Sequence, residues 1–311
     1  MSSHHQNHQT ERHPSIKNGT FTLPSSNGNN SSETYHIPLN EHNTTTLHAG
    51  GPGGYDVQPW SVTAHTANSI TFTLFDDALS SFPGSVLTTA TYTLLSSQST
   101  SLTIRLVSVP LTETTPIMLS AHNYWNLGAF VSPAADTILN NTLYMPYAKR
   151  WIATDGILVP TGEIRVTRGS PLDFWSAPEG RQMGSGIESA EGFCGTGCRG
   201  FDNALILDRP NGGDVVGSSE NGAEVLTMRA PTTGIEMKLW TNMGGLQIYS
   251  CDGLNGTIAV KGSQQHGNNG TTYVPKYGCV VLEAQDVSFL SCFFSLLFPT
   301  SPRANRGHPC L

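Results

Sequence analysis

Residues 89–94 read TATYTL, and this alternation of threonine with apolar residues decides the fold class. Successive side chains of a β-strand point to opposite faces, so the alternation gives one apolar face and one polar face. The same period recurs at residues 70–74, 102–106 and 235–239. Threonine favours strands because branching at Cβ restricts its side chain in a helix. These segments therefore predict β-strands that bury one face.

Helical periodicity does not extend beyond about two turns anywhere in the chain. Turn sequences separate the strand-like segments, among them Pro83-Gly84, Asn221-Gly222 and Asp252-Gly253. We therefore predict a single all-β domain built from paired, twisted sheets.

The composition sets the size of the core and excludes one class of partner. The chain has 311 residues, of which 37% are hydrophobic and 13% are charged, so it can bury a substantial core. Its net charge is −7 and no basic stripe is visible, which argues against a nucleic-acid partner. We expect a small-molecule ligand, no membrane partner and a monomer.

The signals for localisation disagree with one another. Asn-x-Ser/Thr acceptor sites suggest a protein of the secretory pathway. They occur at Asn18, Asn29, Asn30, Asn43, Asn140, Asn255 and Asn269. No signal peptide opens the chain, because residues 1–13 are rich in histidine, glutamine and serine and contain no apolar core segment. The localisation is therefore undecided.

Four cysteines lie at spacings that leave their state open. Cys194 and Cys198 flank a Gly-Thr-Gly turn, which allows either a small-loop disulfide or half of a metal site. No second cysteine pair lies near them, which argues against zinc. Cys251 and Cys279 are either buried thiols or a second disulfide.

Two segments far apart in the sequence each place one titratable residue in a run that predicts a buried strand. Residues 120–127 read SAHNYWNL around His122, and residues 278–285 read GCVVLEAQ around Glu283. A histidine and a carboxylate held in this way can donate and accept protons on one small molecule. The alternatives are a hydrogen-bonded core histidine and a solvated glutamate at a strand end. Because Glu283 leaves an apolar run, we expect it to be partly desolvated, with a raised pKa.

Further segments extend the pattern along most of the chain. Residues 47–56 read LHAGGPGGYD and place His48 before a glycine-rich loop. Other segments follow in order: 155–164 (DGILVPTGEI), 201–203 (FDN) and 245–249 (GLQIY). Together the segments resemble the motifs of the aldose 1-epimerases, also called galactose mutarotases. The resemblance implies a large antiparallel β-sandwich and the interconversion of the α and β anomers of free hexoses, glucose or galactose.

The same resemblance assigns a role to each candidate residue. It implies that Glu283 is the general base and that His122 is the acid that protonates the ring oxygen of the sugar. It implies that His48 and Asp202 bind hydroxyl groups of the substrate, and Gln247 fits a supporting hydrogen-bonding role. A loop histidine in solvent and a turn aspartate are the alternatives for His48 and Asp202. No metal or cofactor is expected. We expect Tyr124 and Trp125 to pack against the core or the floor of the cleft.

The chain departs from the family pattern at both ends. The family has an Asn-Arg pair where this chain has Pro14-Ser15, and that arginine binds the sugar; losing its forked donor weakens the expected binding. Residues 1–15 are expected to be a disordered polar segment, and residues 16–286 an incomplete mutarotase-like domain. Residues 287–311 are expected to be an atypical tail, whose apolar run of about 12 residues is too short to span a bilayer. We expect the chain as written to be poorly soluble and nearly inactive.

Three other functions remain possible from the sequence. A mutarotase-like enzyme for phosphorylated hexoses would need arginines clustered at the pocket, and the arginines here do not cluster near the motifs. A glycoside hydrolase would need a second catalytic carboxylate about 5 to 10 Å from Glu283, a place that Asp202 could take. The third is a non-catalytic or defective carbohydrate-binding relative.

Overall fold

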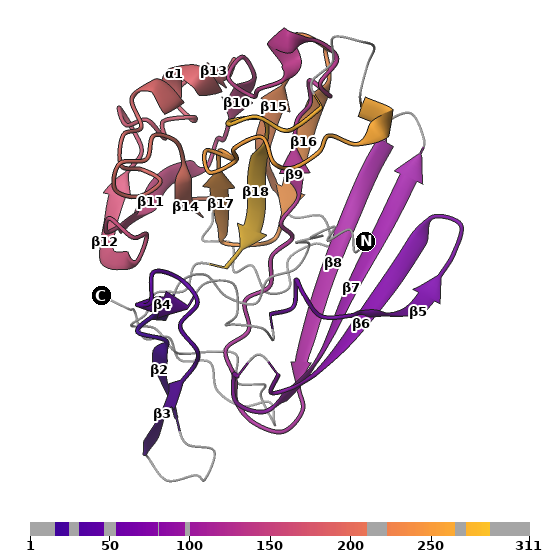
Figure 1. The fold of residues 1–311 in the computed structure, drawn as a ribbon, viewed down its shortest axis with the longest axis vertical. Helices are drawn as coiled ribbons and strands as arrows, with labels where there is room; N and C mark the ends of the chain where they lie inside the picture. The colour runs from indigo at the N-terminus through magenta and orange to yellow at the C-terminus, as the bar shows by residue number, and fades with distance from the viewer. Residues whose placement is uncertain are drawn as a thin grey trace.

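The computed structural model describes residues 16–24, 31–46, 54–79, 81–96, 100–209, 223–264 and 272–286. Within these residues the chain forms five antiparallel sheets and one short α-helix (Figure 1). The all-β prediction is therefore confirmed. The expected N-terminal segment 1–15 and tail 287–311 lie outside the described residues.

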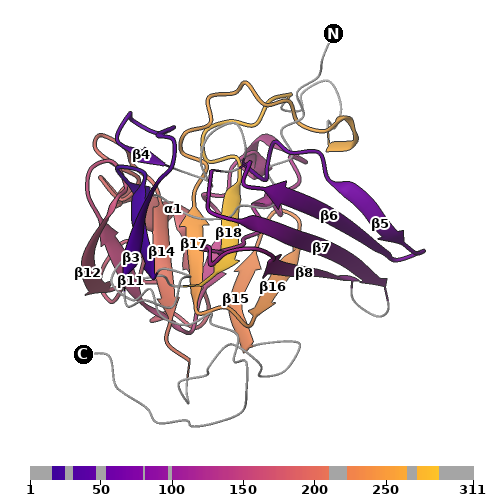
Figure 2. The same ribbon diagram turned by 90° about the horizontal axis from the view of Figure 1, so that it is seen from below.

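A six-stranded sheet runs through the centre of the molecule, in the order β12-β11-β14-β17-β18-β9. Its strands are β9 (Tyr124–Trp125), β11 (Ala148–Thr154), β12 (Pro160–Val166), β14 (Asp202–Leu207), β17 (Gly245–Tyr249) and β18 (Val280–Gln285). Seen from below, β14, β17 and β18 lie side by side at the middle of the molecule (Figure 2). This sheet carries Asp202, Gln247 and Glu283.

A four-stranded sheet, in the order β13-β10-β15-β16, packs against one face of the central sheet. Its strands are β10 (Thr142–Tyr144), β13 (Arg181–Gln182), β15 (Ala223–Arg229) and β16 (Glu236–Thr241), and helix α1 (Met183–Glu188) directly follows β13. The main hydrophobic cluster joins Leu205 and Leu282 of the central sheet to Leu143 and Met228 of this one. The two sheets therefore form a β-sandwich.

A second four-stranded sheet, in the order β5-β6-β7-β8, extends to one side (Figures 1 and 2). Its strands are β5 (Ser61–His65), β6 (Ser69–Asp77), β7 (Ser85–Ser96) and β8 (Thr100–Pro110). The alternating segments 70–74, 89–94 and 102–106 lie in β6, β7 and β8, as predicted. On the threonine face, hydroxyl groups pair across strands, for example Thr71 with Thr91 at 3.0 Å. Segment 235–239 lies in β16, which begins one residue later.

The remaining strands form two small sheets near the N-terminus. β1 (Ile16–Lys17) pairs with β4 (Thr45–Thr46), and β2 (Thr20–Pro24) pairs with β3 (Ser32–His36). Short 3₁₀ turns occur at Pro133–Ala135 and Gly262–Gln264.

The predicted turns at Pro83-Gly84 and Asp252-Gly253 lie between β6 and β7 and just after β17, whereas Asn221-Gly222 lies outside the described residues. None of the helices in the described segments has the length and apolar character needed to cross a bilayer.

Candidate active site

Cross-strand register brings the predicted residues of the central sheet together. Gln247 on β17 lies directly opposite Glu283 on β18. Asp202 on β14 lies opposite Tyr249, which is two residues from Gln247 along the same strand. Because side chains two residues apart share a face, Asp202, Gln247 and Glu283 all project from the same side of the sheet.

The opposite side of these strands is apolar. Leu205, Leu246 and Leu282 belong to the main hydrophobic cluster inside the sandwich. Leu246 and Leu282 are sequence neighbours of Gln247 and Glu283, so alternation sends the leucines into the core and the polar groups to the other face. The sandwich thus provides a rigid support for the polar residues.

The segment around His122 is only partly a strand, and this corrects the prediction. β9 contains Tyr124 and Trp125 alone, which pair with Val281 and Val280 of β18. The Asn126 side chain donates hydrogen bonds to the carbonyl oxygens of Ala135 and Gly278, at 3.1 and 2.9 Å, and the chain turns there. The strand therefore stops immediately after Trp125.

His122 nevertheless reaches Glu283. It lies two residues before Tyr124, so continuing the register of β9 and β18 would place it opposite Glu283. The distance between His122 Nε2 and Glu283 Oε1 is 3.6 Å, and both side chains are buried. The two residues that the sequence proposed as acid and base, 161 positions apart, are thus neighbours in the fold.

Burial controls the protonation of Glu283. Desolvation raises the pKa of this carboxyl group well above its usual range, and the negative charge of Asp202 raises it further. Hydrogen bonding by the Ser120 side chain acts in the opposite direction. The expected desolvation of Glu283 is therefore confirmed, and the group can exchange a proton near neutral pH.

Asp202 is held in a similar environment. Desolvation raises its pKa to about 7, while a hydrogen bond from Gln247 lowers it and the charges of Asp252 and Glu41 raise it. The Gln247 amide Nε2 donates that bond to Asp202 Oδ1 at 2.6 Å. Gln247 therefore links the two acidic residues: it bonds to Asp202 and lies beside Glu283.

The aromatic residues of the SAHNYWNL segment divide between core and site. Trp125 packs against the main hydrophobic cluster, as expected. Tyr124 is 44% exposed, and its ring centroid lies 4.8 Å from that of His122, so of the two predicted places it takes the one at the cleft. Because Tyr124 pairs with Val281, it stands on the same face as Glu283 and forms part of the wall of the site.

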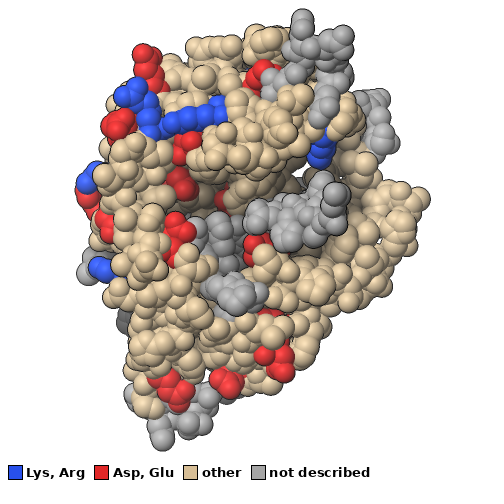
Figure 3. Space-filling view, viewed as in Figure 1, with Lys and Arg blue, Asp and Glu red and all other residues tan. Residues whose placement is uncertain are grey.

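A hollow in the surface lies over β17 and β18, with acidic side chains on its wall (Figure 3). His48, the other residue proposed to bind the sugar, lies outside the described residues. The site described here therefore consists of His122, Asp202, Gln247 and Glu283, with Tyr124 beside them.

The structure decides between the alternatives left open for the cysteines. Cys194 bonds to Cys198, and Cys251 bonds to Cys279. The sulfur atoms of Cys194 and Cys198 lie within 4.8 Å of an Asp252 carboxylate oxygen. As a disulfide, these sulfur atoms are not the thiolates that a zinc site requires.

Two polar residues near Asp202 were missed from the sequence, Ser250 and Asp252. They follow β17 directly, and nothing local distinguishes them from ordinary turn residues. The Asp252-Gly253 sequence predicted a turn at this position but not the hydrogen bond from the Ser250 hydroxyl to Asp252.

The chain is similar to known proteins over most of its length. The sequence profile described as Aldose 1-epimerase matches residues 15–286. A "Probable aldose 1-epimerase" of Arthroderma benhamiae is 44% identical over 291 residues, which cover 87% of this chain and 63% of the relative. A galactose mutarotase of Mus musculus is 26% identical, over 87% of this chain and 67% of its own. The chain thus spans roughly two thirds of the length of these relatives.

Solved structures agree on the fold. A galactose 1-epimerase from Lactobacillus acidophilus superposes with a TM-score of 0.67 at 20% identity, over 91% of this chain and 73% of that one. A GalM/aldose epimerase homologue from C. elegans gives a TM-score of 0.65 at 22% identity, over 89% and 72% of the two chains. With the profile match over most of its length, the chain belongs to the aldose 1-epimerase family.

Proposed function

We propose that this chain is an aldose 1-epimerase that interconverts the α and β anomers of a free hexose, glucose or galactose. The observation that carries the proposal is the buried contact between His122 Nε2 and Glu283 Oε1, at 3.6 Å. Glu283 lies on β18, and His122 lies two residues before β9, so the two groups come from separate segments of the chain. The position of the pair, beside Gln247 and Asp202, supports a site for a ligand rich in hydroxyl groups.

In the proposed reaction the Glu283 carboxylate removes the proton from the hydroxyl group on C1. The electrons of that O–H bond form the C1 carbonyl, the bond from C1 to the ring oxygen breaks, and protonated His122 gives its proton to the ring oxygen. The product is the open-chain aldehyde. Rotation about the C1–C2 bond presents the other face of the carbonyl, and the reverse proton transfers close the ring as the other anomer.

The rate acceleration that mutarotation requires is of the size that two proton-transfer groups can supply. Sugars mutarotate slowly in water without a catalyst, so the enzyme must lower a barrier that is already modest. A positioned general acid or base contributes roughly 10² to 10⁴-fold each. The raised pKa of Glu283, caused first by desolvation, makes its carboxylate a stronger base than one in water.

Binding of the sugar is proposed to fall to the polar residues around the pair. Asp202 and Gln247 offer oxygen and nitrogen atoms that match sugar hydroxyls as hydrogen-bond acceptors and donors. Tyr124 offers a partly exposed ring beside His122, and the apolar face of a hexose packs well on such a ring. His48 is proposed as a further hydroxyl-binding residue.

Polarimetry tests the proposal directly. Freshly dissolved α-glucose or α-galactose should reach its equilibrium rotation faster in the presence of the purified chain, in proportion to its concentration. Nuclear magnetic resonance of the anomeric protons should report the same exchange. Saturable sugar binding without faster anomer exchange would instead identify a carbohydrate-binding protein and overturn the proposed reaction.

A further inference from the structure

The loop that follows β17 is bonded to the beginning of β14, where Asp202 lies. The Ser250 hydroxyl accepts a hydrogen bond from the Phe201 backbone N–H at 2.8 Å and donates one to Asp252 Oδ1 at 2.8 Å. The Ser250 backbone N–H donates to the Phe201 carbonyl oxygen at 2.9 Å. Phe201 is the residue immediately before Asp202, and both Ser250 and Phe201 are fully buried. The backbone next to Asp202 is therefore fixed by the Ser250-Asp252 pair.

Gly200 shows how closely these groups pack. Its φ angle is +151°, which side-chain-bearing residues rarely adopt. A Cβ atom at this position would lie 2.6 Å from Ser250 Oγ and 2.7 Å from Asp252 Oδ1. The glycine therefore allows the Ser250-Asp252 pair to approach the chain just before Asp202.

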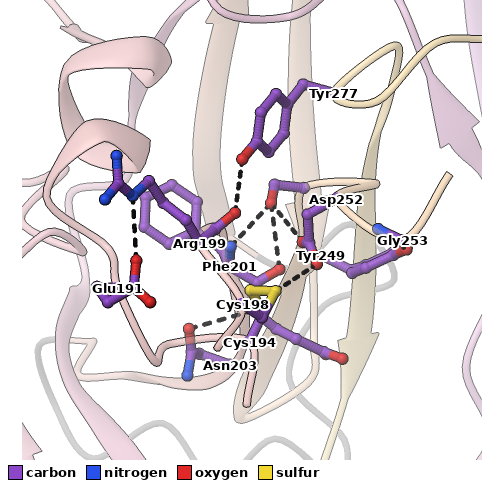
Figure 4. Close-up of a disulfide and its surroundings, with 12 residues drawn as sticks. Glu191, Cys194, Cys198, Arg199, Phe201, Asn203, Tyr249, Asp252, Gly253 and Tyr277 are labelled. Atoms are coloured by element: carbon purple, nitrogen blue, oxygen red, sulfur yellow. Dashed lines mark hydrogen bonds and ion pairs between the residues drawn. A yellow bond between two sulfur atoms is a disulfide. The ribbon is translucent and has the colours of Figure 1, made fainter. Parts of the chain in front are cut away.

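The loop is itself anchored on its other side. The disulfide from Cys251 to Cys279 ties it to the residue before β18. The Tyr277 backbone N–H donates to the Cys251 carbonyl oxygen at 3.2 Å, and the Tyr277 hydroxyl donates to the Arg199 carbonyl oxygen at 2.6 Å. Figure 4 shows the Asp252 side chain between Tyr277 and the Cys194–Cys198 disulfide. The loop thus connects the strands that carry Asp202 and Glu283.

We propose that Ser250 and Asp252 are positioning residues for Asp202: by holding the Phe201 backbone they set the place of the carboxyl group that binds the sugar. The inference rests on the proposed function, because it assigns Asp202 to the substrate. It adds residues that do not themselves touch the sugar. Ser250 supplies the hydrogen bonds, and Asp252 orients the Ser250 hydroxyl as its acceptor.

The charge of Asp252 gives this role a distinct signature. Several acidic groups act on Asp202: Asp252 from the loop, Glu41 from the segment before β4, and Glu283 from β18. Tyr249 lies opposite Asp202 in the ladder of β14 and β17. Desolvation raises the pKa of Tyr249 to about 12, so its hydroxyl group stays neutral. Asp252 is the only charged member of the Ser250-Asp252 pair, so removing its charge should lower the pKa of Asp202.

Three variants separate position from charge. Ser250→Ala removes the side-chain hydrogen bond to the Phe201 backbone, and Asp252→Ala removes the acceptor that orients the Ser250 hydroxyl. Both should raise KM for galactose roughly 3- to 10-fold, the effect of about one hydrogen bond, with little change in kcat. Asp252→Asn keeps the size of the side chain and an oxygen that can accept from Ser250. It should keep KM close to the parent value, while the Asp202 carboxyl group, followed by carbon NMR, titrates at lower pH. Glu163→Gln is the control, because it removes a fully exposed carboxylate on β12.

These experiments distinguish a failure of the positioning role from a failure of the proposed function. Folded Ser250→Ala and Asp252→Ala proteins with the parent KM would overturn the positioning role. If these variants do not fold, an unchanged Asp202 titration in Asp252→Asn overturns the role of Asp252. A parent chain without mutarotase activity would refute the proposed function. The NMR titration of Asp202 requires no turnover, so it would still test the connection between Asp252 and Asp202 in that chain.

Discussion

His122 Nε2 lies 3.6 Å from Glu283 Oε1, and each side chain is 8% exposed. Water is therefore largely excluded from the space between these two groups, which come from distant segments of the chain. Burial raises the pKa of the Glu283 carboxyl group, and the negative charge of Asp202 raises it further. A reaction that needs one group protonated and the other ionised at the same time is well served by this arrangement.

The first prediction concerns the pair itself. Glu283→Gln removes the base while keeping the volume of the side chain, and His122→Asn removes the acid. Each variant should lower kcat for anomer exchange at least about 100-fold, the minimum expected of a positioned proton-transfer group. Polarimetry at matched protein concentration measures the loss.

Matched controls distinguish chemistry from folding in this experiment. Glu163→Gln and His65→Asn change the same residue types at exposed positions of β12 and β5, and both should keep the parent rate. A Glu283 or His122 variant that keeps more than about a tenth of the parent rate would contradict the assigned role, given the expected size of the effect.

The second prediction concerns Gln247, whose amide donates to Asp202 Oδ1 at 2.6 Å. That bond favours the ionised carboxylate, so Gln247→Ala should raise the pKa of Asp202 further. KM for galactose should rise roughly 10- to 100-fold, as expected when a hydrogen bond to a charged group is lost. Initial rates across sugar concentrations at several pH values measure this. Gln182→Ala, which removes a surface amide on β13, should leave KM unchanged.

The third prediction links the buried site to stability. The pKa of Asp202 rises from its ordinary 3.8 to about 7 because burial disfavours the charged form. The folded protein therefore binds this proton more tightly than the unfolded chain does. Its contribution to stability is complete below about pH 4 and is lost as the pH rises through 7. The loss is at most roughly 4 kcal/mol, since one pKa unit corresponds to about 1.4 kcal/mol.

Denaturant unfolding of Asp202→Asn between pH 4 and pH 8 checks this. The variant should lose less stability than the parent as the pH rises. Asp173→Asn is the matched control: burial acts to raise the pKa of Asp173, but hydrogen bonds from Gly169 and Ser176 outweigh it and lower that pKa. Its contribution is therefore constant over the same range. Parallel pH profiles for the parent and Asp202→Asn would show that the pKa of Asp202 is not raised on folding.

The strands could be predicted from sequence because their signal is local. In β7 the polarity of each residue indicates which face of the sheet its side chain occupies, and no knowledge of the neighbouring strand is needed. The polarity of Glu283 within VVLEAQ was readable for the same reason. The residue opposite Glu283 could not be predicted in this way, because the register between β17 and β18 depends on both strands.

The errors arose where distant segments decide the outcome. The apolar run around His122 predicts a strand, but the ladder with β18 covers Tyr124 and Trp125 alone, and Asn126 then binds the carbonyl oxygen of Gly278. The sequence predicted that Tyr124 packs against the core or the floor of the cleft, and its position in the ladder with β18, which places it beside the site, could not be read from its own segment. The Ser250-Asp252 connection joins two loops that no local pattern relates.

The last prediction concerns the two disulfides, which differ in the length of chain that they close. Cys251 and Cys279 are 28 residues apart and join the loop after β17 to the residue before β18, whereas Cys194 and Cys198 are four residues apart. A cross-link that closes a longer loop removes more conformational entropy from the unfolded chain. Cys251→Ala with Cys279→Ala should therefore lower the free energy of unfolding by roughly 3 to 4 kcal/mol, and Cys194→Ala with Cys198→Ala by roughly 2 kcal/mol. Alanine avoids burying an unpaired hydroxyl group at positions 251 and 279, where the cysteines are buried. Unfolding of both double variants in urea measures the difference, with the remaining disulfide verified by mass spectrometry. If the two losses of stability were equal, or if the loss from the shorter loop were larger, native-state contacts rather than loop closure would set the contribution of each bond.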